Sequence, residues 1–184
     1  RIGAGLGDDL LHAWKLASQV PLHFESFYRG TWDGSLYTEG FSSWIDRDDG
    51  ARTFFDIDAF IKRPVLDTKR YINIADFVKA GGVAGPGIFS PLALAAELDR
   101  DAAEAARRVA AIRTKAKTSP TLECELTDVE AWGAYGSYFA EKLRAGVALA
   151  TARAKQDPKQ QAAAIAALER ALVHWKRLAE LGGK

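Results

Sequence analysis

The sequence has no methionine, a single cysteine and three histidines among its 184 residues. The lone Cys124 excludes an intrachain disulfide, and His12, His23 and His174 are too scattered to predict a zinc site. We therefore expect no metal and no other cofactor. An ordinary gene product begins with methionine, whereas this chain begins with Arg1. We expect it to be a processed product or a piece of a longer protein.

Long apolar runs and an excess of one charge are also missing. No stretch of 18 apolar residues is present, which is what a membrane-spanning helix needs, and the N-terminus has no signal-peptide pattern. The chain has 25 basic and 24 acidic residues, with a net charge of +1. A protein that neutralises many phosphates needs a basic excess. We therefore expect neither a nucleic-acid partner nor a membrane partner.

Hydrophobic residues make up 48% of the chain, which is enough for a core without metals or disulfides. Three helix-start signals divide its second half, at Ser90-Pro91, Ser119-Pro120 and Asp157-Pro158. Each combines a side-chain oxygen at the N-cap with a proline at the first helical position. Thr127, followed by Glu130, fits a capping box and is an alternative start for the middle segment.

Apolar residues recur at helical spacing between these signals. We expect a first helix over about 91–117, a second reaching about 155, and a third over about 158–181. Their short links predict antiparallel neighbours and hence a bundle. The expected core positions are Leu94, Leu98, Val109 and Ile112, then Trp132, Tyr135, Phe139, Leu143, Val147 and Ala150, and finally Ile165, Leu168, Leu172, Trp175 and Leu178.

The first half of the chain is less regular. The segment "GDDLLHAWKLASQV" predicts a helix, which Pro21 either kinks or follows with a second helix. Shorter helices are expected within 54–63 and 71–82. The predicted organisation is 1–89, with N-terminal helices and an aromatic loop, and 90–184, with the three-helix bundle. We expect the two to form one compact, mainly α domain.

The N-terminal region contains the stretch "SFYRGTWDGSLYTEGFSSW", residues 26–44, in which six of nineteen residues are aromatic. Flat rings beside carboxylates and an arginine are typical of a sugar-binding pocket, and the glycines allow tight turns. The candidate binding residues are Tyr28, Arg29, Trp32, Asp33, Tyr37, Glu39 and Trp44. The alternative is a structural flap, in which Phe27, Leu36, Phe41 and Ile45 cap the end of the bundle.

No catalytic residue can be assigned from these patterns. A glycosidase pair made of Asp33 and Glu39 would need carboxyl groups about 5–5.5 Å or about 6.5–9.5 Å apart, which spacing within a loop does not establish. His23 and Glu25 lie two residues apart, but no nucleophile with a matching third group accompanies them. We do not expect the chain to be catalytic on its own.

Two segments resemble a known group of proteins. "LLHAWKLASQVPLHFESFYRGTWDGSLYTEGF" (10–41) resembles a segment of large bacterial carbohydrate-active, glycoside-hydrolase-like proteins that include relatives of the α-glucuronidases. "YGSYFAEKLRAGVALA" and "AIAALERALVHWKRLAEL" resemble the closing helical bundle of those proteins. Together the segments cover about 40% of the chain, and their motifs are of modest specificity.

The resemblance implies a C-terminal helical part of such an enzyme, without the catalytic barrel. Trp32, Asp33, Tyr37 and Glu39 would then face an oligosaccharide or another domain of the same chain, and an exported protein would be expected. The competing hypothesis is a helical interaction or assembly module without a ligand, including a homo-oligomer. A sugar site keeps its rings accessible beside a carboxylate, whereas an assembly face is apolar and contiguous.

Overall fold

A computed structural model describes residues 5–28, 57–117 and 119–183. Within these ranges the chain forms helices and no β-strand, and one isolated β-bridge joins Tyr71 to Phe89. The helices are α1 (Leu6–Ala17), α2 (Gln19–Tyr28), α3 (Ile57–Lys62), α4 (Ile74–Lys79), α5 (Pro91–Lys115), α6 (Pro120–Lys155) and α7 (Pro158–Gly182). The predicted mainly α class is confirmed.

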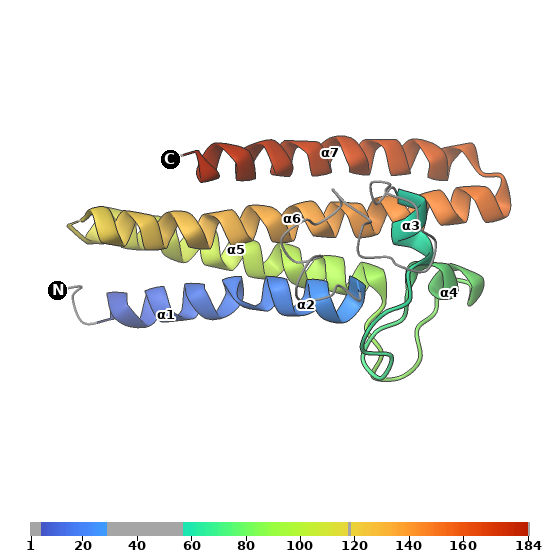
Figure 1. The fold of residues 1–184 in the computed structure, drawn as a ribbon, viewed down its shortest axis with the longest axis horizontal. Helices are drawn as coiled ribbons and strands as arrows, with labels where there is room; N and C mark the ends of the chain where they lie inside the picture. Colours follow the sequence, from blue (N-terminus) through green and yellow to red (C-terminus); the bar gives the residue numbers. More distant parts are fainter. Residues whose placement is uncertain (1–4, 29–56, 118, 184) are drawn as a thin grey trace, which may run out of the picture.

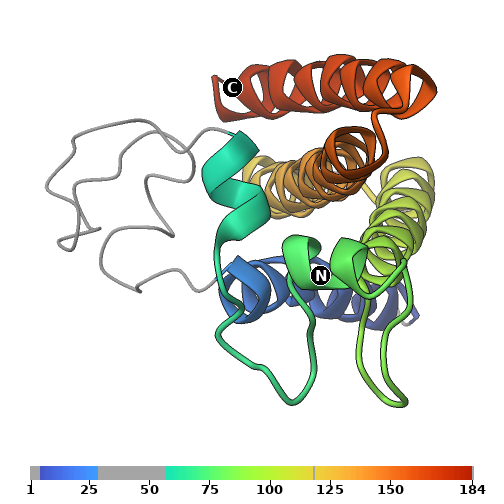
Figure 2. The same cartoon turned by 90° about the vertical axis from the view of Figure 1, so that its right-hand side faces the viewer.

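The three long helices form the predicted antiparallel bundle, with α6 at its centre (Figure 1). At 36 residues, α6 is about 54 Å long. α5 packs on one side of it and carries α1 beyond, while α7 runs back along another side as the outermost helix (Figures 1 and 2). α3 and α4 pack near the C-terminal end of α6. Because α7 packs on α6 alone among the long helices, much of its circumference faces solvent.

The predicted N-caps of the long helices are confirmed. The Ser90 hydroxyl accepts a hydrogen bond from the Ala93 N–H at 3.0 Å. The Asp157 carboxylate accepts one from the Lys159 N–H at 2.9 Å. Ser119 caps α6 at Pro120, so the alternative start at Thr127 is wrong. Thr127 lies inside α6 because the helix already begins at Pro120, where the Ser119 side chain accepts a hydrogen bond from the Leu122 N–H.

Pro21 begins a second helix rather than kinking the first. α1 ends at Ala17, and Pro21 lies in the first turn of α2. Backbone N–H groups in the first turn of a helix have no acceptor within it, so a proline there costs no hydrogen bond. The two short helices also form as predicted. α4 is capped by Asn73, whose side chain accepts from the Asp76 N–H at 2.7 Å.

The main core lies where α2, α3 and α4 meet α5 and α6. Phe139 of α6 is at its centre, with ring centroids 5.3 Å from Phe24, 6.0 Å from Phe27 and 6.0 Å from Phe60. A second cluster joins α1, α5 and α6. The confirmed core predictions are Leu94, Leu98, Val109, Ile112, Phe139, Leu143 and Val147, while Trp132, Tyr135 and Ala150 are half-buried.

The predicted core stripe of α7 is wrong. Ile165, Leu168 and Leu172 are 53%, 39% and 51% exposed. The residues that α7 buries are instead Ala164, Ala167 and Ala171 and, in its last turn, Leu181. Alanines let two helix backbones approach closely, so the alanine stripe faces α6 and turns the larger residues outward. Of the other two predicted positions, Trp175 and Leu178 are half-buried, and Trp175 packs on Tyr138 with centroids 4.9 Å apart.

Candidate functional site

The predicted aromatic loop lies almost wholly outside the described residues. Arg29, Trp32, Asp33, Tyr37, Glu39 and Trp44 belong to the undescribed range 29–56, and Tyr28 is the last residue of α2. The sugar-binding hypothesis and the structural-flap alternative therefore both stay predictions.

A buried histidine is the most unusual polar group of the core. His23 of α2 is 2% exposed, and its Nδ1 lies 2.7 Å from the hydroxyl of Tyr71, which is equally buried. On the other side of the ring, Nε2 lies 3.5 Å from the Glu97 carboxylate of α5. Tyr71 and Glu97 are about 50 and 75 residues away from His23 in sequence, so no local pattern around His23 predicts these two contacts.

The surroundings of His23 oppose its protonation on balance. Burial lowers the pKa of His23 most strongly, and Arg70 lowers it further, while Glu97 and Asp101 raise it. Burial disfavours the charged form of Asp101 as well, and so raises the pKa of this carboxyl, which interacts with His23 and Glu97. His23 is therefore a neutral core group of α2 that lies between Tyr71 and Glu97, and its Nε2 makes no hydrogen bond within the described residues.

We expect the protein to lose stability on acidification through His23. The unfolded chain takes up a proton near the ordinary pKa of 6.5, whereas the folded chain does so only at lower pH. Stability is thus fully present above pH 6.5 and falls as the pH drops below it, by at most about 1.4 kcal/mol per pH unit. Urea unfolding at pH 7.5 and 5.5 measures the loss. His23→Gln should flatten the slope, and an unchanged slope would contradict this assignment.

Burial also shifts the pKa of Glu25, a half-buried acid on the same helix. Burial raises the pKa of Glu25, and Arg63 opposes that rise. Its Oε1 has no hydrogen-bond partner among the residues that the structure describes. Glu25 and His23 lie on the same short helix, but no described contact joins them into a catalytic pair.

One hollow of about 450 Å³ lies at the turn between α6 and α7. Its walls combine aliphatic and polar groups and include no aromatic ring. The lining residues are Leu149, Ala152, Arg153, Gln156, Asp157, Pro158 and Gln161. Arg153 is already paired with Asp58 of α3. Within the described ranges, no group of three or more His, Cys, Asp or Glu side chains could hold a metal.

The outer face of α7 exposes four large apolar side chains. Ile165, Leu168 and Leu172 form a stripe at i, i+3 and i+7, and Val173 beside it is 65% exposed. We call these four residues the α7 stripe. Such spacing places the apolar side chains on one side of the helix. A contiguous exposed apolar stripe is typical of a surface that binds another helix or a groove.

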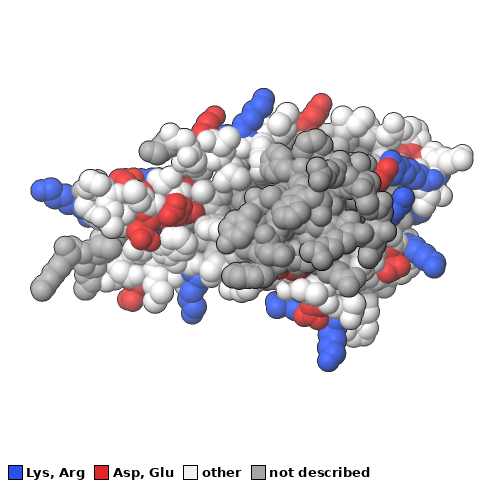
Figure 3. Space-filling model, viewed as in Figure 1, with Lys and Arg blue, Asp and Glu red and all other residues white. Residues whose placement is uncertain are grey.

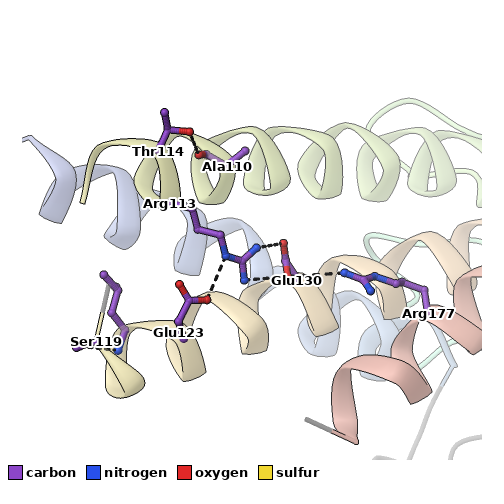
Figure 4. Close-up of polar contacts among 8 residues, drawn as sticks. Ala110, Arg113, Thr114, Ser119, Glu123, Glu130 and Arg177 are labelled. Carbon is purple, nitrogen blue, oxygen red and sulfur yellow. Dashed lines mark hydrogen bonds and ion pairs between the residues drawn. The ribbon is translucent and has the colours of Figure 1, made fainter. Parts of the chain in front are cut away.

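Arginines on another side of α7 fix the rotation of the helix. Arg170 donates to Glu141 of α6 at 2.8 Å, and Arg177 lies 4.0 Å from Glu130 of α6. Glu130 also binds Arg113 of α5, so α5, α6 and α7 share one ionic cluster (Figure 4). Exposed ion pairs are individually worth about 1 kcal/mol or less, so these two pairs favour, together with the alanine packing, the rotation that turns the α7 stripe away from α6.

Elsewhere among the described residues the exposed large apolar side chains lie on separate elements, namely Leu11, Leu22, Leu66, Val83 and Leu92. On the face shown in Figure 3, acidic and basic side chains occur at both ends of the molecule, around the part drawn in grey. Every helix of the described ranges is too short or too polar to cross a bilayer. Comparisons with protein-family models, with curated proteins and with solved structures found no match. The α7 stripe is therefore the candidate functional surface.

Proposed function

We propose that this chain is a helical protein–protein interaction module that binds its partner through the α7 stripe. The observation that carries the proposal is the exposure of Ile165, Leu172 and Val173, each more than half exposed on one helix. Anchors at i, i+3 and i+7 are the pattern by which an amphipathic helix meets another helix or a groove.

The packing of α7 supports the same proposal. The helix is attached through its buried alanines and Leu181, through Trp175 on Tyr138 and through the Arg170 ion pair, so the four residues of the α7 stripe are not needed for its attachment. Full burial of an exposed Leu or Ile side chain is worth about 1.5–3 kcal/mol, and the half-exposed side chains of the α7 stripe have roughly half of that still to gain. A partner that covers the α7 stripe would therefore release a substantial part of its binding energy there.

A position-specific cross-link tests the proposal. A photoreactive benzoyl-phenylalanine placed at Leu172 should cross-link to a partner in the cells that produce the protein. The matched control places the same residue at Leu11, which is 63% exposed on α1 but outside the α7 stripe. Adding Ile165→Lys should abolish the cross-link from position 172. Equal cross-linking from both positions, or none from 172, would overturn the proposal.

The carbohydrate-active hypothesis remains a second proposal and rests on the sequence alone. The aromatic stretch 26–44 and the resemblance to glycoside-hydrolase-like proteins support it. Its test is intrinsic tryptophan fluorescence titrated with glucuronic acid and plant-polysaccharide oligosaccharides. A saturable change that Trp32→Ala removes would place a glycan at this stretch. A Trp32→Ala protein that loses only thermal stability would favour the structural flap.

A further inference from the structure

Two opposite charges lie within the α7 stripe, between Leu172 and Val173 around the helix. Glu169 and Lys176 are both exposed and lie seven residues apart, which places them two helical turns apart on the same side of α7. No ion pair of either with another described residue is present. The flanking Glu180, by contrast, lies 3.5 Å from Arg177 within α7.

This pair of charges is evenly spaced about the most exposed part of the α7 stripe. Leu172 and Val173 lie midway between Glu169 and Lys176, about 5 Å along the helix axis from each. A two-fold axis that passes beside the helix at this level, perpendicular to the helix axis, places a second α7 alongside the first in the antiparallel direction. Glu169 of one copy then lies at the height of Lys176 of the other, and the same pair forms twice.

A parallel pair of α7 helices lacks this match. Its two-fold axis runs along the helices, so each residue lies at the same height as the identical residue of the other copy. Glu169 of one copy then meets no Lys176 of the other. Only the antiparallel arrangement joins the apolar contact and the charges in one interface.

We propose that the partner of the α7 stripe is a second copy of this chain, bound antiparallel through α7 with Leu172 and Val173 at the two-fold axis. The inference rests on the proposed function and adds the identity of the partner. The near-zero net charge of +1 leaves little overall repulsion between two copies. One helix pair buries less area than an obligate dimer, so the association should depend on concentration.

Sedimentation equilibrium from about 1 µM to about 1 mM protein tests the dimer, a range that spans weak to moderate affinities. Glu169→Lys alone, or Lys176→Glu alone, places like charges at positions 169 and 176 of opposite copies, which creates two repulsive pairs across the two-fold axis. Each should raise the dissociation constant by about tenfold. The double variant E169K/K176E restores two opposite-charge pairs and should return the constant to near that of the unchanged protein.

Apolar substitutions give the matched control. Leu172→Lys should abolish the dimer, while Leu11→Lys should leave it intact, and far-UV circular dichroism verifies that both proteins remain folded. A protein that stays monomeric over the whole range, or a double variant as weak as the single ones, would overturn the homodimer. A cross-link from position 172 to a different protein would keep the interaction module but also overturn the homodimer, whereas no cross-link would overturn both.

Discussion

Phe139→Ala should lower the free energy of unfolding by about 3–5 kcal/mol, the largest effect of any single substitution considered for this protein. Phe139 is 1% exposed, and three other phenylalanine rings pack around it. Those rings come from α2 and α3, so the cavity would lie where three helices meet. Rigid rings close such a cavity poorly, which places the cost in the upper part of the range.

The matched control is Leu172→Ala on α7. Because Leu172 is 51% exposed, the same kind of truncation should change the free energy of unfolding by only about 0.5 kcal/mol. Urea unfolding of both variants at a concentration where the protein is monomeric measures the difference. A loss at Leu172 close to that at Phe139 would mean that α7 buries the α7 stripe in solution and would remove the basis of the proposed interaction surface.

The sequence predicted the helix starts and most of the core because these depend on local chemistry. Ser90 and Asp157 cap their helices through bonds to residues two or three positions on. The apolar spacing in α5 likewise identified Leu94 and Leu98, which are buried. Such signals are complete within one or two helical turns, so no tertiary information was needed to interpret them.

The rotation of α7 could not be predicted in the same way. The stripe Ile165, Leu168, Leu172 and the stripe Ala164, Ala167, Ala171 have the same spacing and differ by one residue, or about 100° around the helix. Apolar size favours the first stripe for the core, but close approach to α6 favours the second. The ion pairs from Arg170 and Arg177 to α6 turn the second stripe inward. These contacts cross between helices, and the sequence does not show them.

The buried polar contact at His23 was missed for a related reason. Its partners come from the segment around Tyr71 and from α5, and only the folded chain brings them together. A histidine on a helix that also carries Phe24 and Phe27 was the available signal, since both neighbours are core residues. That signal indicates burial but does not identify the hydrogen-bond partner.

Gly146→Leu should lower the free energy of unfolding by about 2 kcal/mol and loosen α3 and α4 first. A Cβ atom at this position would lie 2.7 Å from Ile74 Cδ1, and 3.5 Å from both Ile61 Cγ1 and Phe60 Cδ1. Overpacking of a core costs about 1–3 kcal/mol. The higher helix propensity of leucine offsets this by up to about 1 kcal/mol. We place the overpacking cost at the top of its range because Ile74 is fully buried and has little room to move.

Amide hydrogen exchange distinguishes this local effect from a general loss of stability. The side chains that a larger residue at position 146 would displace belong to α3 and α4. The backbone amides of these two helices should therefore exchange faster, while those of α5 stay protected. Gly133→Ala is the matched control, because its Cβ would lie 3.8 Å from Ala102, an ordinary contact. That substitution should stabilise the protein by up to about 1 kcal/mol through helix propensity. If both substitutions stabilise the protein, α4 does not pack against α6 at Gly146.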